Sequence, residues 1–165
     1  FGLARTHPEQ APTRYREWLD QVRSPPTFAR FPSLEAFAHL LARRNPRLTP
    51  GRATFIAAAW TERQADGSVT VRADPAHKRV NPVLYQADEV VETWARIAAP
   101  LLWVEGADTD VAKWWGERYP RREFDARLAR VPQVERETLA DCGHMLHHDQ
   151  PEALAARLRR FLDAP

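Results

Sequence analysis

The chain has 165 residues, of which 44% are hydrophobic and 28% charged, the composition of one soluble globular domain and rarely of two. No stretch approaches 18 uninterrupted apolar residues, which excludes a membrane-spanning helix. A single cysteine, Cys142, excludes an internal disulfide framework and a cysteine-rich zinc module.

Charge gives little information about partners. The 24 lysines and arginines nearly balance 22 aspartates and glutamates, and all but two of the basic residues are arginine. The arginine doublets lie on separate segments with acidic residues nearby, without the interleaved aromatic residues of a nucleic-acid-binding stripe. We therefore expect no nucleic-acid partner.

The beginning of the chain is unusual for a translated polypeptide. It reads Phe1-Gly2-Leu3, and the only methionine is Met145. This pattern predicts a processed or fragmentary chain whose native N-terminus lies elsewhere. Because no basic segment followed by an apolar one marks a signal peptide, we expect a cytoplasmic protein.

Residues 1–86 contain helical signals but no convincing run of strands. Apolar residues recur at helical spacing from Tyr15 to Val22, Ser33 can cap a second helix, and Thr49-Pro50 begins a third. Asp66-Gly67 predicts a turn, and residues 69–71 a short extended piece.

Residues 87–165 change to an alternating pattern of helices and strands. Helices are expected at 88–97, across 111–131 with a break at Pro120, and from 149 to the end, with Leu154, Leu158, Phe161 and Leu162 facing inward. Strands are expected at 101–104 and 134–139. The fold class is therefore α/β, with two parallel strands between flanking helices.

Two parallel strands do not form a stable sheet by themselves, and the first would leave an apolar edge open. The sequence therefore predicts an incomplete sheet that a missing N-terminal segment or a second chain completes.

Acidic residues and a histidine follow the two strands. Asp108 and Asp110 come after the first strand, and Gly143-His144 after the second. Loops at the carboxyl ends of parallel strands meet at one edge of the sheet. A carboxylate there can hold an imidazole in the tautomer that a general base requires.

These segments resemble the last third of an α/β-hydrolase. The stretch from Leu101 to Asp110 is similar to that family's seventh strand and acid loop, and Gly143-His144 with the helix after Pro151-Glu152 is similar to its eighth strand and final helix. The resemblance implies that residues 1–86 form the helical cap, or lid, and residues 87–165 a C-terminal core segment. It also implies that His144 is the catalytic base and that Asp110, which follows Thr109, is the acid, with Asp108 as the alternative.

The nucleophile elbow of that family, Gly-x-Ser-x-Gly, is absent, since no two of the six glycines lie four positions apart. By resemblance the nucleophile belongs to the missing N-terminal half, which is the expected partner. This chain alone is then expected to be inactive.

Other polar residues are weaker candidates. Cys142 with the histidines at 144, 147 and 148 invites a metal interpretation, but the loop context and the single thiol argue against it, so we expect no metal and no cofactor. His147 and His148 are expected to support the site or to lie on the surface, and Cys142 to be a small buried residue. Tyr85 and His77 are weak candidates for substrate contact, together with Lys78 and Arg79.

The aromatic residues of the first half are expected mainly to pack the cap core, and alternatively to line an apolar pocket. They are Tyr15, Trp18, Phe28, Phe31, Phe37, Phe55 and Trp60.

Three functions are compatible with the sequence. The first is a serine hydrolase of the carboxylesterase type, split or processed, that acts on a small apolar ester through an acyl-enzyme. The second is a member with an aspartate nucleophile, a haloalkane dehalogenase or epoxide hydrolase. The third is a non-catalytic helical interaction module in which His144 is structural.

Overall fold

The computed structural model describes residues 3–110 and 112–163, so the expected helix start at Val111 and the opening Phe1-Gly2 lie outside the described residues. The chain divides into two compact units. We call Ala11–Val83 the inserted unit, and Phe1–Gln10 with Leu84–Pro165 the α/β unit. Residues 1–10, expected in the helical first half, thus group with the second half of the chain.

The inserted unit contains three helices that begin and end close to the expected positions: α1 (Ala11–Arg23), α2 (Leu34–Arg44) and α3 (Pro50–Trp60). The Ser33 hydroxyl accepts a hydrogen bond from the Ala36 amide at the start of α2. Thr49 caps α3 in the same way, with Pro50 in the first turn. Both caps satisfy backbone N–H groups that have no partner within the helix.

A small antiparallel sheet completes this unit, and the expectation of no strand run in the first half is wrong. Strands β1 (Arg30–Phe31) and β2 (Thr61–Arg63) pair on either side of β3 (Val69–Val71). The expected turn at Asp66-Gly67 joins β2 to β3, with Gly67 at φ 84°. Strands of two or three residues are too short to show an alternating pattern in sequence.

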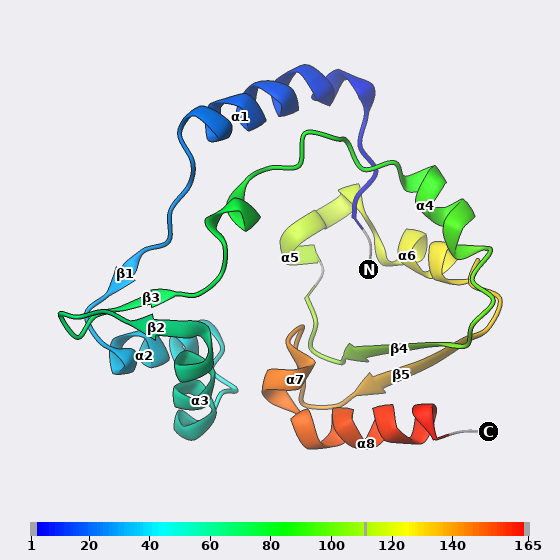
Figure 1. Cartoon of the computed structure of the whole chain (residues 1–165). Helices are drawn as coiled ribbons and strands as arrows, with labels where there is room; N and C mark the ends of the chain where they lie inside the picture. Colours follow the sequence, from blue (N-terminus) through cyan, green and yellow to red (C-terminus); the bar gives the residue numbers. More distant parts are fainter. Residues whose placement is uncertain (1–2, 111, 164–165) are drawn as a thin grey trace. The chain divides into compact units, whose positions relative to one another are not determined.

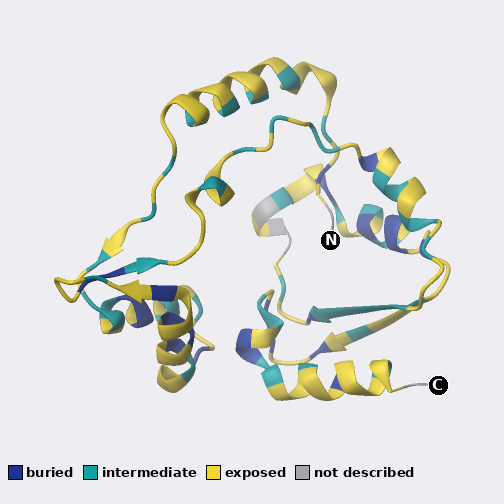
Figure 2. Ribbon diagram, viewed as in Figure 1, coloured by how far each residue is buried: buried dark blue, intermediate teal, exposed yellow. Residues whose placement is uncertain are grey.

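The core of the inserted unit lies between α2, α3 and the sheet. Phe37, Ile56 and Val69 are buried there, and Phe31 packs on Phe37 with ring centroids 4.7 Å apart. Three other aromatic side chains expected in this core are instead largely exposed: Tyr15 at 51%, Phe55 at 75% and Trp60 at 41%. Figure 2 shows the extent of exposed surface on α1 and α3.

The α/β unit is built around two parallel strands, as predicted. Strand β4 (Leu101–Gly106) pairs in register with β5 (Val134–Leu139). The other elements of this unit are η1 (Pro8–Gln10), α4 (Ala87–Trp94), α5 (Ala112–Trp115), η3 (Gly116–Arg118), α6 (Arg121–Leu128), α7 (Leu146–Asp149) and α8 (Pro151–Leu162), as in Figure 1. The inserted unit also contains η2 (Pro75–Lys78).

The two faces of this sheet are covered differently. On one face, Leu101, Trp103 and Val134 pack against an apolar cluster that includes Phe124 of α6, whose ring lies 4.9 Å from that of Trp103. On the other face, the buried Arg157 of α8 forms ion pairs with the β5 residues Glu135 and Glu137. β5 therefore has the charged side chains of an edge strand, whereas β4 is mostly apolar.

The expectation that the apolar residues of α8 all face inward is wrong for two of them. Leu158 is 42% exposed and Leu162 is 75% exposed. Part of the apolar face of this helix is therefore left uncovered by the described residues.

The chain leaves and re-enters the α/β unit at one place. The Thr6 hydroxyl donates to the Tyr85 carbonyl oxygen over 2.8 Å, and Arg5 pairs with Asp88 at 2.7 Å. Arg127 of α6 donates to the Leu3 carbonyl oxygen at 2.8 Å. Residues 11–83 are consequently an insertion whose two ends are joined by the α/β unit.

Among residues 3–110 and 112–163, no helix has both the length and the apolar character that crossing a membrane requires.

Candidate active site

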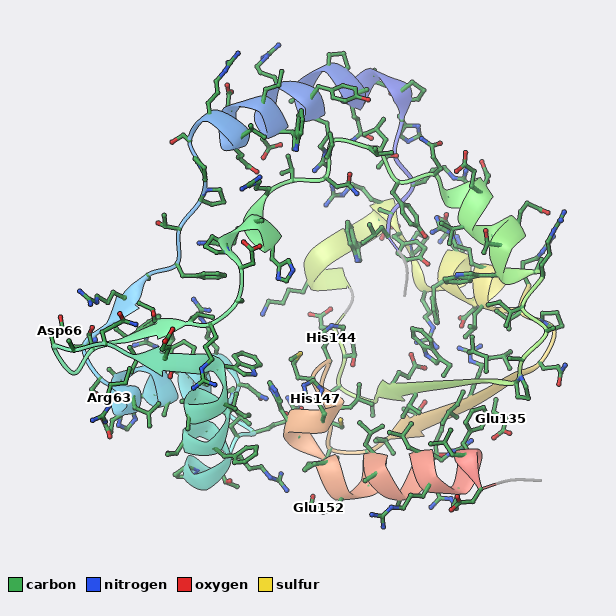
Figure 3. All side chains as sticks on the ribbon, viewed as in Figure 1. Arg63, Asp66, Glu135, His144, His147 and Glu152 are labelled. Carbon is green, nitrogen blue, oxygen red and sulfur yellow. The ribbon has the colours of Figure 1, made fainter. Side chains whose placement is uncertain are left out.

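The loops that follow β4 and β5 lie at the same edge of the sheet. Because the strands are parallel, their carboxyl ends point the same way, as the arrowheads in Figure 1 show. We call residues 107–110 the acid loop and residues 140–145 the histidine loop. Figure 3 shows His144 at this edge, beyond the strand ends.

The backbones of the two loops are in direct contact. The Ala107 amide donates to the Leu139 carbonyl oxygen at 2.8 Å, and the Asp108 amide donates to the Cys142 carbonyl oxygen at 2.9 Å. A Cβ atom on Gly106 would lie 2.3 Å from the carbonyl oxygens of both Cys142 and Gly143. Only glycine at position 106 allows the histidine loop to come this close.

Both candidate acids are exposed on the acid loop. One carboxylate oxygen of Asp110, Oδ1, accepts a hydrogen bond from the Lys113 amide in the first turn of α5, at 3.1 Å. Asp110 therefore caps this helix. A carboxylate has further acceptor sites, so capping is compatible with a second hydrogen bond to an imidazole.

His144 is exposed, and the residues just before it are held firmly. Asp141 adopts a left-handed conformation, with φ 52°, directly after β5. Cys142 is fully buried, and its thiol lies 3.5 Å from the Gly143 carbonyl oxygen, in agreement with a packing role. The Gly143 amide donates to the carboxylate of Asp149 at 2.8 Å.

The other two histidines of this region differ in exposure. His147 is exposed and His148 is buried, with their rings in edge contact at 4.2 Å between centroids. Burial lowers the pKa of His148, and the neighbouring His147 lowers it further, against the opposing effect of Asp149. Within the described part of the chain, no three His, Cys, Asp or Glu side chains gather as a metal site would require.

The weaker candidates have local roles. Tyr85 accepts the Thr6 hydrogen bond through its backbone, at the junction with the inserted unit. His77 is exposed in η2, where its amide donates to the Asp74 carbonyl oxygen at 3.0 Å. Neither contact involves a side-chain group that points to substrate binding.

None of the three serines stands in a Gly-x-Ser-x-Gly sequence; Ser33 lies between β1 and α2, but without the flanking glycines of a nucleophile elbow. Ser33 caps α2, and the Ser68 hydroxyl donates to Asp66 at 2.6 Å. Ser24 directly follows α1, and its amide donates to the Asp20 carbonyl oxygen.

Solved structures that are similar to this chain include a thioesterase domain and an esterase. A thioesterase domain from the curacin biosynthetic pathway matches with a TM-score of 0.71 at 22% identity, over 95% of this chain and 53% of that one. A hypothetical protein of Pseudomonas aeruginosa PAO1 matches with a TM-score of 0.77 at 20% identity, over 98% and 56%. An esterase of Mycobacterium tuberculosis matches with a TM-score of 0.67 at 18% identity, over 98% and 53%.

A family model described as "Alpha/beta hydrolase family" matches residues 3–157. The chain therefore belongs to the α/β-hydrolase family, and the resemblance inferred from its two strands and their loops is confirmed. It spans about half the length of the solved structures that it matches. No curated protein matches it significantly.

Sequence reasoning missed two residues that shape this site. The sequence patterns assign no role in the site to Gly106 or Asp149, which the structure places against the histidine loop. A glycine directly before an acid loop, and an acid five residues after a candidate histidine, are signals that could have identified them.

Proposed function

We propose that this chain supplies the histidine and the acid of a catalytic triad to a hydrolase that cleaves small apolar esters through an acyl-enzyme. The observation that carries the proposal is the backbone contact between the acid loop and the histidine loop, through the Asp108–Cys142 hydrogen bond and Gly106. This contact brings an acidic segment and His144 to one edge of the sheet.

In this mechanism His144 takes the proton from the nucleophile and later returns it to the leaving group. The acid accepts a hydrogen bond from the other ring nitrogen, which fixes the tautomer and stabilises the imidazolium. We assign this role to Asp110, because the Thr109-Asp110 pair matches the family pattern, and keep Asp108 as the alternative. The reaction requires no cofactor.

The nucleophile, a serine, and the oxyanion-hole donors come in this proposal from a segment outside these 165 residues. Three observations support it: the elbow motif is absent from the sequence, the hydroxyls of Ser33 and Ser68 have local structural roles, and the related structures are about twice as long. Among the described residues the mostly apolar β4 pairs with β5 alone, so further strands can pair along its other edge. Without that segment, the chain is expected to be inactive.

Of residues 1–86, expected to form the cap, we assign the inserted unit to the cap, since residues 3–10 and 84–86 group with the α/β unit. The segments before and after it, which belong to the α/β unit, are joined by the Thr6–Tyr85 hydrogen bond, as expected for an insertion into a sheet domain. The exposed Tyr15, Phe55 and Trp60 provide apolar surface suited to an acyl or alkyl group.

A fluorophosphonate probe tests the proposal on the complete hydrolase, meaning this chain with the segment that carries the nucleophile. We expect one labelled serine, in a Gly-x-Ser-x-Gly sequence outside these 165 residues, and parallel loss of p-nitrophenyl butyrate hydrolysis. Labelling of Ser24, Ser33 or Ser68, or hydrolysis that survives complete labelling, would contradict the proposal.

The acid is assigned by paired substitutions. Asp110→Asn is expected to lower kcat by about 10⁴-fold, because a wrong tautomer disables the base, whereas Asp108→Asn changes it less than about tenfold. The reverse order of effects would assign the acid to Asp108.

A further inference from the structure

A buried carboxylate lies behind the histidine loop and has no part in the mechanism above. Asp149, the last residue of α7, is 7% exposed, and its Oδ2 accepts the hydrogen bond from the Gly143 amide at 2.8 Å. Carboxylates are rarely buried unless they are hydrogen-bonded, and their bonds to backbone N–H groups are short and strong. Asp149 is therefore a strong constraint on the residue directly before His144.

The peptide group that contains the Gly143 amide is held by hydrogen bonds at both of its polar atoms. The peptide between Cys142 and Gly143 offers its carbonyl oxygen to the Asp108 amide at 2.9 Å and its N–H to Asp149. Because a peptide group is planar and stiff, two opposed hydrogen bonds fix both its place and its tilt. The acid loop and α7 thus clamp one peptide group from two sides, one residue before His144.

The chain from His144 back to Asp149 is short and tightly wound. The amides of His148 and Asp149 both donate to the Met145 carbonyl oxygen, at 2.8 and 3.1 Å. The Gln150 side chain reaches back to the Asp141 carbonyl oxygen at 3.3 Å. Because this segment is short and hydrogen-bonded, we expect a displacement of the Asp149 side chain to displace His144 as well.

We propose that Asp149 is a positioning residue for His144: its carboxylate holds the Gly143 amide and so sets where the imidazole lies relative to the acid and the nucleophile. This inference rests on the proposed function, since it requires His144 to be the base. It assigns Asp149 no proton transfer and no contact with substrate.

The test compares Asp149→Leu with Asp149→Asn in the complete hydrolase, using p-nitrophenyl butyrate. Both replacements keep the four non-hydrogen side-chain atoms of aspartate, branched at Cγ, but only asparagine retains an oxygen that accepts the Gly143 hydrogen bond. We expect the leucine variant to lose about 10–100-fold in kcat with KM within about threefold, because a displaced base weakens the chemical step. The asparagine variant should stay within about fivefold of the parent.

Two comparisons separate positioning from a merely structural role. Glu135→Leu, which removes a carboxylate that pairs with Arg157 near the start of β5, away from the histidine loop, should alter kcat less than about threefold. In a His144→Ala background, Asp149→Leu should change the residual rate less than about twofold, because the residue it positions is gone. An equal loss with and without His144 would overturn the inference, as would an unchanged kcat in Asp149→Leu.

The failure of each proposal is distinguishable. If His144→Ala retains the parent's activity, the proposed function fails. If His144→Ala is inactive and Asp149→Leu is not impaired, only the positioning role fails. Should the leucine variant not fold, as judged by circular dichroism, Asp149→Glu replaces it; this variant shifts the carboxylate by one methylene, and an unchanged kcat would equally refute the inference.

Discussion

Replacing Gly106 by alanine tests the contact on which the site depends. The new Cβ would lie 2.3 Å from the carbonyl oxygens of Cys142 and Gly143 and 2.7 Å from the Cys142 carbonyl carbon. All three atoms belong to backbone, which cannot rotate aside as a flexible side chain does. Since such contacts below 3.0 Å essentially do not occur, the two loops must separate by about 0.7 Å.

The cost of this separation has two parts. Overpacking of a well-packed region costs about 1–3 kcal/mol, and weakening the Asp108–Cys142 hydrogen bond costs about 1 kcal/mol more. We expect Gly106→Ala to reduce the free energy of unfolding by about 2–4 kcal/mol, measured by urea denaturation of the complete hydrolase. Because a shift of about 1 Å in a catalytic group can cost about 100-fold in rate, ester hydrolysis should fall to a similar extent.

Gly51 provides a matched control for this experiment. It lies in the first turn of α3, where an added Cβ meets nothing within 4 Å. Gly51→Ala should therefore leave stability unchanged or raise it by up to about 1 kcal/mol. If the free energy of unfolding of the Gly106→Ala variant lies within about 0.5 kcal/mol of the parent's, the two loops do not pack as closely as described.

Two further predictions concern stability. Ser33→Ala removes the hydrogen-bond acceptor at the start of α2 and should lower the free energy of unfolding, measured by urea denaturation, by about 1 kcal/mol. Ser24→Ala, just beyond α1, should lower it much less. Equal losses in the two variants would contradict the capping role of Ser33. Burial lowers the pKa of His148 in the folded state, so the unfolded chain binds more protons and stability decreases as the pH falls through the ordinary histidine range towards that lowered pKa. His148→Gln should flatten this decrease, and an unchanged pH profile would show that His148 is not the group responsible.

Much of the fold could be predicted because its signals are local. The continuous apolar run at Leu101 identified β4, and Pro151 marked the start of α8. Capping residues located α2 and α3 for the same reason. The strands β1 and β2 gave no such signal, because their pairing with β3 depends on contacts between distant parts of the chain.

The site was predictable only in part. The positions of His144 and the two acids relative to the strand ends follow from local patterns and the resemblance to the family. The roles of Gly106 and Asp149 depend on contacts with backbone atoms of Cys142 and Gly143, which every residue type has, so the residue types at positions 142 and 143 do not indicate these contacts. The exposed Phe55 was misjudged because periodicity shows which residues share a face, and not what covers that face.

The central claim is that His144 acts as the base of a hydrolase, and a comparison of two histidine variants tests it most directly. His144 and His147 are both exposed and lie three positions apart, so replacing either by alanine should perturb folding little. For the complete hydrolase, we predict that His144→Ala lowers kcat/KM for p-nitrophenyl butyrate by at least about 10³-fold, while His147→Ala stays within about threefold. Equal, small effects of the two substitutions would contradict the account.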